Sequence, residues 1–127
     1  WVVNPTRRIR ESLRDLHPDV PVIGFPRGAG PAAVWYVAET GVDGIGCDTA
    51  TPPYVMKEAF EDDDVVVQGN LDPLLLVTGG PHMDERVDEI LSLMAGERFI
   101  FNLGHGIVPQ TPPEHVARLV ERVRKGT

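Results

Sequence analysis

The stretch FNLGHGIVPQTPPEH, Phe101–His115, joins the end of a short apolar run to the start of a helix. The run Phe99–Leu103 has the character of a buried strand. After it, Thr111 is predicted as an N-cap residue with Glu114 three positions on, a capping box. Between the two elements, His105 stands between two glycines where the strand ends. A structural histidine needs no glycine on either side, whereas a histidine in close contact with a ligand can use them.

Three further apolar runs precede this one in the chain. None shows a clean alternation of apolar and polar residues, which is typical of strands in a parallel sheet that is covered on both faces. Each is followed by a loop and a helical pattern. The runs are Val20–Phe25, Gly44–Cys47 and Val65–Gln68.

Helices are predicted before, between and after these strands. The first has Asn4 as its N-cap, Pro5 at its first position and a stop at Pro18. The next two are Pro31–Thr40, with Gly41 as a C-cap, and Pro53–Phe60. The last two are marked by apolar stripes, namely Val87, Ile90, Leu91 and Met94, then Val116, Leu119, Val120 and Val123.

The predicted order is therefore α-β-α-β-α-β-α-β-α, an α/β fold with a parallel sheet. Two architectures share this pattern: an open doubly wound sheet, and half of a (β/α)8 TIM barrel, which has eight strands. In both, the loops after the strands carry the chemistry. No internal repeat or domain linker is visible, so residues 1–127 are expected to form a single segment.

Composition narrows the classes of function. With 12 basic and 19 acidic residues the formal net charge is −7, which disfavours a nucleic-acid partner. The single cysteine, Cys47, cannot form an internal disulfide and fits a reducing cytosol, so we expect a cytoplasmic location. No apolar stretch has the length of a membrane span. The chain begins at Trp1 without a methionine, and we expect it to be a piece of something longer.

Most polar residues in the predicted loops have a structural interpretation. Arg27–Gly30 resembles a phosphate-binding turn, but a tight strand-to-helix turn with a solvated Arg27 is the favoured interpretation. Asp48 is a candidate base or N-cap, and capping is the commoner role. An Asx turn explains Asp72, which precedes Pro73. Gly69 with its neighbour Asn70 is expected to form a sharply bent loop.

The histidines divide into two groups. His17, His82 and His115 lie near helix ends, where a surface position explains them. His105 is the candidate site residue, with Asn102, Gly104 and Gly106 as its loop neighbours. No second histidine or cysteine lies at metal-ligand spacing, so no metal site is expected.

The motifs NLGHGI (Asn102–Ile107) and TPPEHV (Thr111–Val116) resemble the C-terminal portion of the uroporphyrinogen decarboxylase family. The resemblance continues through VVQGNLDP (Val66–Pro73), AETGVDGIGCD (Ala38–Asp48) and the glycine-rich turn at Arg27, and so spans nearly the whole chain. At Thr49 the sequence departs from the family, which often has tryptophan after the aspartate.

The resemblance implies the C-terminal half of a (β/α)8 barrel, with the N-terminal half absent from this chain. It also implies a cofactor-free lyase of porphyrin and heme biosynthesis. Such an enzyme converts the acetate side chains of uroporphyrinogen III to methyl groups, giving coproporphyrinogen III. The family's other pocket residues belong to segments that precede Trp1, whereas its pocket histidine falls on His105. This chain alone is expected to be inactive.

Two alternatives stay open at this point. The same superfamily contains cobalamin-linked methyltransferases that use zinc held by His and Cys, and a non-catalytic binding domain could reuse the half-barrel. Half a barrel leaves its edge strands unpaired and its interior uncovered, so self-association, as in the family's homodimer, is a further expectation.

Overall fold

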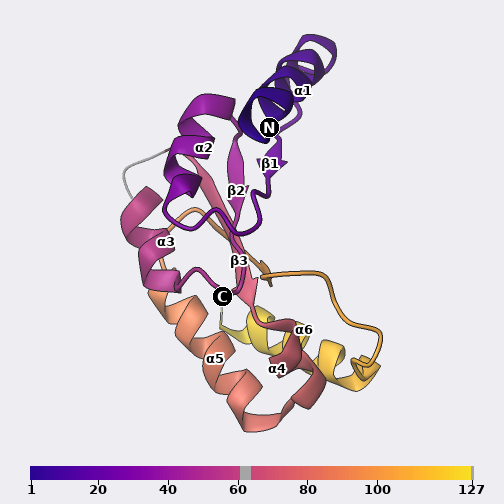
Figure 1. The fold of residues 1–127 in the computed structure, drawn as a ribbon. Helices are drawn as coiled ribbons and strands as arrows, with labels where there is room; N and C mark the ends of the chain where they lie inside the picture. The colour runs from indigo at the N-terminus through magenta and orange to yellow at the C-terminus, as the bar shows by residue number, and fades with distance from the viewer. Residues whose placement is uncertain (61–63, 127) are drawn as a thin grey trace.

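The computed structural model describes residues 1–60 and 64–126, which contain one parallel sheet and the helices around it (Figure 1). The strands are β1 (Ile23–Gly24), β2 (Gly44–Gly46), β3 (Val66–Leu71) and β4 (Phe99–Leu103). The helices are α1 (Val3–Leu16), α2 (Ala32–Thr40), α3 (Pro53–Phe60), α4 (Pro73–Thr78), α5 (Gly80–Leu93) and α6 (Pro113–Lys125).

The strand order is β1-β2-β3-β4, and every pair of neighbours is parallel. A doubly wound sheet would reverse its order at a switch point. Here each strand instead pairs with the next strand in sequence. Helices α2, α3 and α5 lie along one side of the sheet (Figure 1). This is the wall of a (β/α)8 barrel with four of the eight strands, so the half-barrel prediction is confirmed and the doubly wound alternative is wrong.

The helix-covered face of the sheet carries the core. Ile45, Val67 and Leu71 on this face are 0%, 3% and 0% exposed. They belong to two clusters, one around α2 and α3 and one among α4, α5 and α6. The spacing of two residues along β2 and β3 therefore places one apolar row against the helices.

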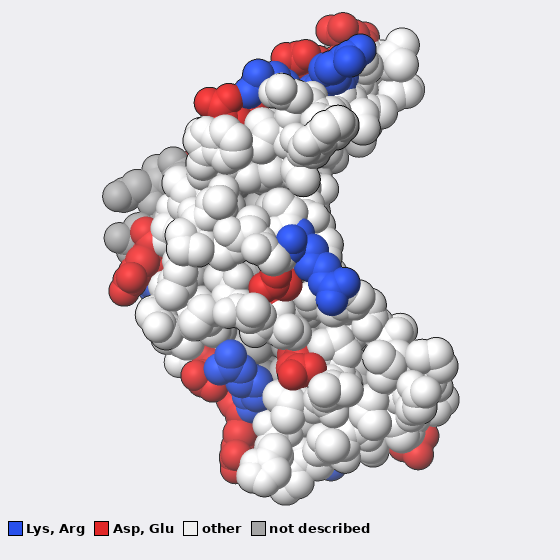
Figure 2. All heavy atoms as spheres, viewed as in Figure 1, with Lys and Arg blue, Asp and Glu red and all other residues white. Residues whose placement is uncertain are grey.

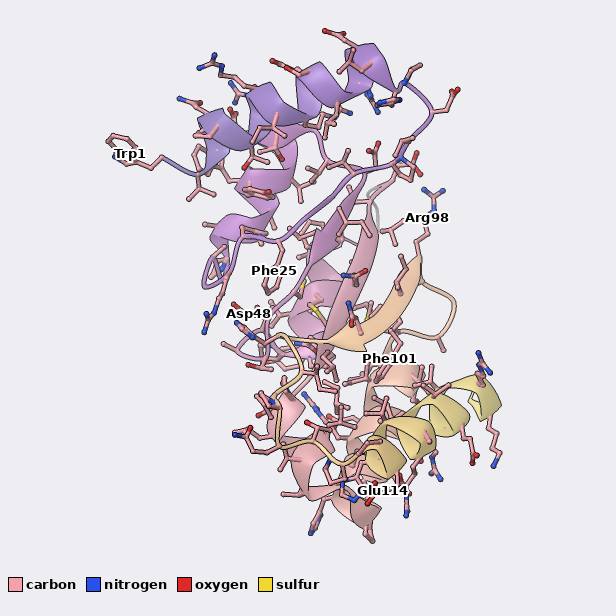
Figure 3. All side chains as sticks on the ribbon, turned by 90° about the vertical axis from the view of Figure 1, so that its right-hand side faces the viewer. Trp1, Phe25, Asp48, Arg98, Phe101 and Glu114 are labelled. Carbon is pink, nitrogen blue, oxygen red and sulfur yellow. The ribbon has the colours of Figure 1, made fainter. Side chains whose placement is uncertain are left out.

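The opposite face of the sheet is open. The pairing register places Ile23 beside Gly44, and Ile100 beside Gln68, in the rows that alternate with the core row. Ile23, Phe25 and Ile100 are 41%, 48% and 43% exposed. Figure 2 shows the molecule hollowed on its right-hand side, and Figure 3 looks onto that side, with Phe25 labelled. In a closed barrel these rows would face the interior.

Helix α1 lies at one end of the sheet and packs against α2. Polar contacts hold it: Arg7 pairs with Glu39, and Arg14 Nη2 lies 3.1 Å from Asp43 Oδ1. Its apolar stripe of Ile9, Leu13 and Leu16 is 62%, 40% and 72% exposed. The amphipathic pattern that predicts this helix therefore has no partner surface in the part of the chain that the structure describes.

The first half of the chain shows two differences from the sequence prediction. Asn4 is not the N-cap residue of the first helix, which begins at Val3 after Val2. Strand β1 has only two residues rather than the six of Val20–Phe25. Pro21 has no N–H to donate, and the N–H of Val22 donates to Asp43 Oδ2 at 2.8 Å instead of extending the strand.

The segment after β3 differs more. Gly69 and Asn70 were expected to form a bent loop, but they belong to β3 and pair with Phe101 and Asn102 of β4. Asp72 is the N-cap residue of an additional short helix, α4, which the sequence prediction lacked. An aspartate followed by proline is a helix-start signal, and here it marks a helix of six residues.

The start of α6 corrects the predicted capping box. The N-cap residue is Pro112, whose backbone is extended, so Thr111 lies one residue outside the helix. The Thr111 hydroxyl oxygen is buried without a hydrogen-bond partner among the described residues. By contrast, the predicted α3 (Pro53–Phe60), β4 (Phe99–Leu103) and the Gly41 C-cap, at φ 63°, are confirmed. In the described part of the chain, no helix is long and apolar enough to cross a membrane.

Candidate functional site

The loops that follow the four strands surround one cavity of about 500 Å³. Each loop contributes to its lining, and the cavity lies at the carboxyl ends of the strands, where (β/α)8 barrels place their sites. The charged and imidazole side chains that line it are Arg27, Asp48, Asp72 and His105.

His105 lies in this cavity as an exposed residue of the β4–α6 loop. Its imidazole has no hydrogen-bond or ion-pair partner among residues 1–60 and 64–126. An imidazole without a partner can donate a hydrogen bond to an anionic ligand or, when protonated, pair with it.

The two glycines beside His105 differ in their surroundings. Gly104 is buried, and a Cβ atom there would lie 2.6 Å from the backbone nitrogen of Thr49. Nothing lies within 4 Å of a Cβ at Gly106. Gly104 therefore permits close contact between the loops after β2 and β4, while Gly106 leaves open space beside the imidazole.

Asn102 is not part of this cavity. Its side chain is exposed, and its Oδ1 accepts a hydrogen bond from Leu103 N at 2.8 Å. It lines a separate hollow of about 240 Å³ between β4 and α6, whereas Gly104 and Gly106 line the cavity with His105. The structure thus brings three of the four sequence-predicted site residues together.

Asp48 connects two of the loops. Its Oδ2 accepts a hydrogen bond from Gly28 N at 2.7 Å, and its Oδ1 accepts from Ala50 N at 3.1 Å. The Gly28 N–H, more than any other contact, lowers the pKa of Asp48 below its ordinary value. The predicted capping role is wrong, because α3 begins only at Pro53 and the contact of Asp48 with Ala50 belongs to a local turn. The bond to Gly28 was not foreseen. A carboxylate held in this way is a poor candidate for a base. Figure 3 labels Asp48 among these loops.

Asn70, on strand β3, holds the loop that contains Asp48. Its Nδ2 donates to Asp48 O at 2.8 Å and to Thr51 O at 2.5 Å. Because both partners are carbonyl oxygens, the amide nitrogen must face them, which leaves Oδ1 buried and without a partner among the described residues. Asn70 itself is 2% exposed. A single sequence gives no signal for this role, since Asn after Gly is equally typical of a turn.

The remaining acid of the cavity has a local role. Asp72 Oδ1 accepts a hydrogen bond from Leu74 N at 2.8 Å, which is the predicted Asx turn and caps α4. Asp48 and Asp72 are therefore both bound to backbone N–H groups. The donor side chains of the cavity, Arg27 and His105, therefore remain available to bind a ligand.

His115 lies outside the cavity and is not a simple surface residue. It is half-buried, and its Nδ1 lies 3.0 Å from the carbonyl oxygen of Leu76, so this nitrogen carries the proton. A Cβ atom at Gly79 would lie 2.6 Å from the ring. His115 thus ties α6 to α4, a contact between residues 39 positions apart in sequence.

The other polar groups of the described residues give no second site. A hollow of about 310 Å³ at the opposite ends of the strands is lined by Lys57 and Glu97, which pair at 3.0 Å. Burial, and then the charge of Asp48, raise the pKa of the Cys47 thiol to about 12, which keeps it protonated at neutral pH. Within residues 1–60 and 64–126 no group of three His, Cys, Asp or Glu side chains could hold a metal ion.

The strand order, the one-sided helices and the cavity at the carboxyl ends of the strands define a segment of a (β/α)8-barrel protein. In agreement, a methyltransferase from Methanosarcina mazei has the same fold, with a TM-score of 0.73 over 98% of this chain and 35% of its own. The sequences are 19% identical, so this likeness concerns the fold alone.

Sequence comparison identifies the family. The profile of the uroporphyrinogen decarboxylase family matches residues 1–126, and the chain belongs to this family. It is 52% identical over 124 residues to the uroporphyrinogen decarboxylase of Rhodospirillum rubrum and also to that of Granulibacter bethesdensis. The matches cover 98% of this chain but only 35% and 36% of those relatives. The chain therefore spans about a third of the length of the curated relatives that it matches.

Proposed function

We propose that this chain is the C-terminal half-barrel of a uroporphyrinogen decarboxylase and that His105 contacts the substrate there. The observation that carries the proposal is the position of His105 in a cavity at the carboxyl ends of the strands, in a chain that matches the family over residues 1–126. The substrate class is a tetrapyrrole with several carboxylates, and the product carries methyl groups in place of acetates.

The reaction itself indicates what the protein must supply. Each acetate loses CO₂ when its C–C bond breaks, and a proton then replaces the carboxyl group on the same carbon. The electrons of the broken bond are best accepted by a protonated pyrrole ring. The protein therefore has to hold the carboxylates, exclude water and deliver a proton. His105, with an unpaired imidazole, is suited to the first of these tasks.

Apart from His105, which we assign to binding the substrate, the described residues of the cavity are poor proton donors for the ring. Asp48 and Asp72 accept hydrogen bonds from backbone N–H groups, and the Cys47 thiol is buried. We therefore propose that the residues that gather and protonate the ring come from the other part of the barrel, and that this chain alone is inactive.

The open face of the sheet supports a proposal about partners. Ile23, Phe25 and Ile100 are exposed apolar side chains on this surface, with Ile100 on the edge strand β4. In the family's architecture it would be covered by the other half of the barrel. We propose that the chain meets either that half or a second copy of itself, and that the complete enzyme is a cytoplasmic homodimer.

A chimera tests the proposed function. The segment of the Rhodospirillum rubrum relative that matches this chain is replaced by residues 1–127, and conversion of uroporphyrinogen to coproporphyrinogen is followed. The proposal predicts turnover by the chimera and none by the isolated 127-residue chain. A well-folded chimera without turnover would favour a non-catalytic half-barrel. Stoichiometric zinc in the chimera, with methyl transfer in place of decarboxylation, would favour the methyltransferase alternative.

A further inference from the structure

Arg27 lines the same cavity as His105 but belongs to the loop after β1, whereas His105 belongs to the loop after β4. It is exposed, and no carboxylate of the described residues lies within ion-pair distance of its guanidinium. The two acids of the cavity are already bound to backbone N–H groups. Arg27 and His105 therefore line the same cavity from two different loops, and neither side chain has a partner among the described residues.

The backbone around Arg27 has a defined shape. Arg27 N donates to Phe25 O at 3.1 Å, and Ala29 N donates to Pro26 O at 3.0 Å, which closes a turn. Gly28 has φ 73° in this turn, a backbone conformation that residues other than glycine rarely adopt. The favoured interpretation of this segment as a tight strand-to-helix turn is therefore confirmed.

Asp48 holds this turn in place from the neighbouring loop. Its carboxylate accepts the Gly28 N–H at 2.7 Å, one residue from Arg27. The Asp48 loop is itself fixed by Asn70, whose amide donates to Asp48 O at 2.8 Å. A continuous set of hydrogen bonds therefore runs from β3 through the loop after β2 to the residue beside Arg27.

We propose that Arg27 binds a carboxylate of the substrate opposite His105, and that Asp48 is a positioning residue that acts through Arg27. The proposal rests on the proposed function and deepens it, because two carboxylate-binding groups in separate loops select a substrate with at least two carboxylates. A guanidinium can bind a carboxylate through two parallel hydrogen bonds, which fixes its orientation as well as its charge. Neither residue takes part in bond cleavage.

The first test uses the active chimera and two substitutions at Arg27. Arg27→Gln removes the charge, and the expected result is a rise in KM of about tenfold or more with kcat changed less than about threefold, because binding is lost rather than chemistry. Arg27→Lys keeps the charge without the paired N–H groups and should restore part of the loss. Arg86→Gln is the control, since Arg86 pairs with Glu89 on α5 away from the cavity, and its KM should match the unmodified chimera.

The second test is a double-substitution cycle. Asp48→Asn keeps the size of the side chain but leaves one oxygen to serve the contacts that two oxygens serve now. It should raise KM when Arg27 is present and add little in the Arg27→Gln background, because a residue that acts through Arg27 has no further effect once Arg27 is gone. A merely structural role of Asp48 would change KM by the same factor in both backgrounds.

The outcomes separate this proposal from the proposed function. An active chimera whose KM is unchanged by Arg27→Gln overturns the Arg27 assignment and leaves the decarboxylase assignment standing. Equal effects of Asp48→Asn in both backgrounds overturn the positioning role. An inactive, folded chimera overturns the proposed function and this inference with it.

Discussion

The two faces of the sheet differ sharply although the same strands form both. On the helix-covered face, Ile45 and Leu71 are each 0% exposed. On the open face, Ile23 and Ile100 remain 41% and 43% exposed. The comparison shows that the chain builds its own core on one side of the sheet only, whereas apolar side chains of the described residues stay exposed on the other side. The site cavity lies at the carboxyl ends of the strands, between the loops that follow them.

The largest expected effect concerns this contrast. Ile45→Ala removes a fully buried side chain from the core and should lower the free energy of unfolding by about 2–5 kcal/mol. Ile100→Ala removes a side chain that is 43% exposed and should cost less than about half as much. Urea unfolding of both variants of the chain measures the difference. Equal losses would contradict the distinction between the two faces.

The glycines beside His105 provide a second matched pair. A Cβ at Gly104 would lie 2.6 Å from Thr49 N, a backbone atom that cannot move away easily, so Gly104→Ala should destabilise the chain by about 1–3 kcal/mol. Gly106→Ala meets nothing within 4 Å and should change stability by less than about 0.5 kcal/mol. Thermal unfolding of the two variants decides this. Similar melting temperatures would mean that the loops after β2 and β4 are not in close contact.

The open face also predicts association. At micromolar concentration the 127-residue chain should form dimers or larger species, because covering the exposed apolar side chains of this face removes them from water. Ile100→Lys places a charge on this face and should weaken association at least about tenfold, roughly 1.4 kcal/mol. Val34→Lys is the control, since Val34 is also 43% exposed but lies on α2. Light scattering that shows a stable monomer for the unmodified chain would refute the prediction.

The smallest expected effect is a dependence of stability on pH that arises from Asp48 in the cavity. The pKa of Asp48 is lowered from 3.8, chiefly by the Gly28 N–H, so its contribution to stability is complete above 3.8 and is lost as the pH falls below that value. Asp48→Asn should therefore be less stable at pH 7 and lose less stability on acidification. The pKa values of Asp84 and Asp88 are also lowered, chiefly by hydrogen bonds from Arg118 and Arg122, respectively. These pairs are present in both proteins, so the difference between the two unfolding curves isolates Asp48.

Sequence reasoning succeeded where local pattern and final structure agree. The run Phe99–Leu103 became β4 with the predicted bounds, and Pro53–Phe60 became α3. It failed where a contact between distant segments decides the outcome. The N–H of Val22 donates to Asp43, which shortens β1, and His115 is half-buried because its ring contacts Leu76 O. Neither partner can be inferred from spacing along the chain.

The candidate site shows the same division. Strand ends and glycines predicted the position of His105, because the carboxyl ends of parallel strands meet at one edge of a sheet. The link between Asp48 and Gly28 crosses 20 residues of sequence and has no pattern of its own. Arg27 is exposed, as predicted for a solvated turn residue, but its place at the cavity has no signal in the turn sequence.

The most direct test of the central claim is the effect of His105→Ala on kcat/KM in the active chimera. The claim that His105 contacts a substrate carboxylate predicts a loss of about 1–3 kcal/mol in transition-state stabilisation, the scale of one hydrogen bond to a charged group, with an unchanged melting temperature. His82→Ala, at a histidine side chain that is 88% exposed on α5, should leave both values unchanged. If His105→Ala instead unfolds the protein while kcat/KM per folded molecule is preserved, His105 is structural and the site assignment is wrong.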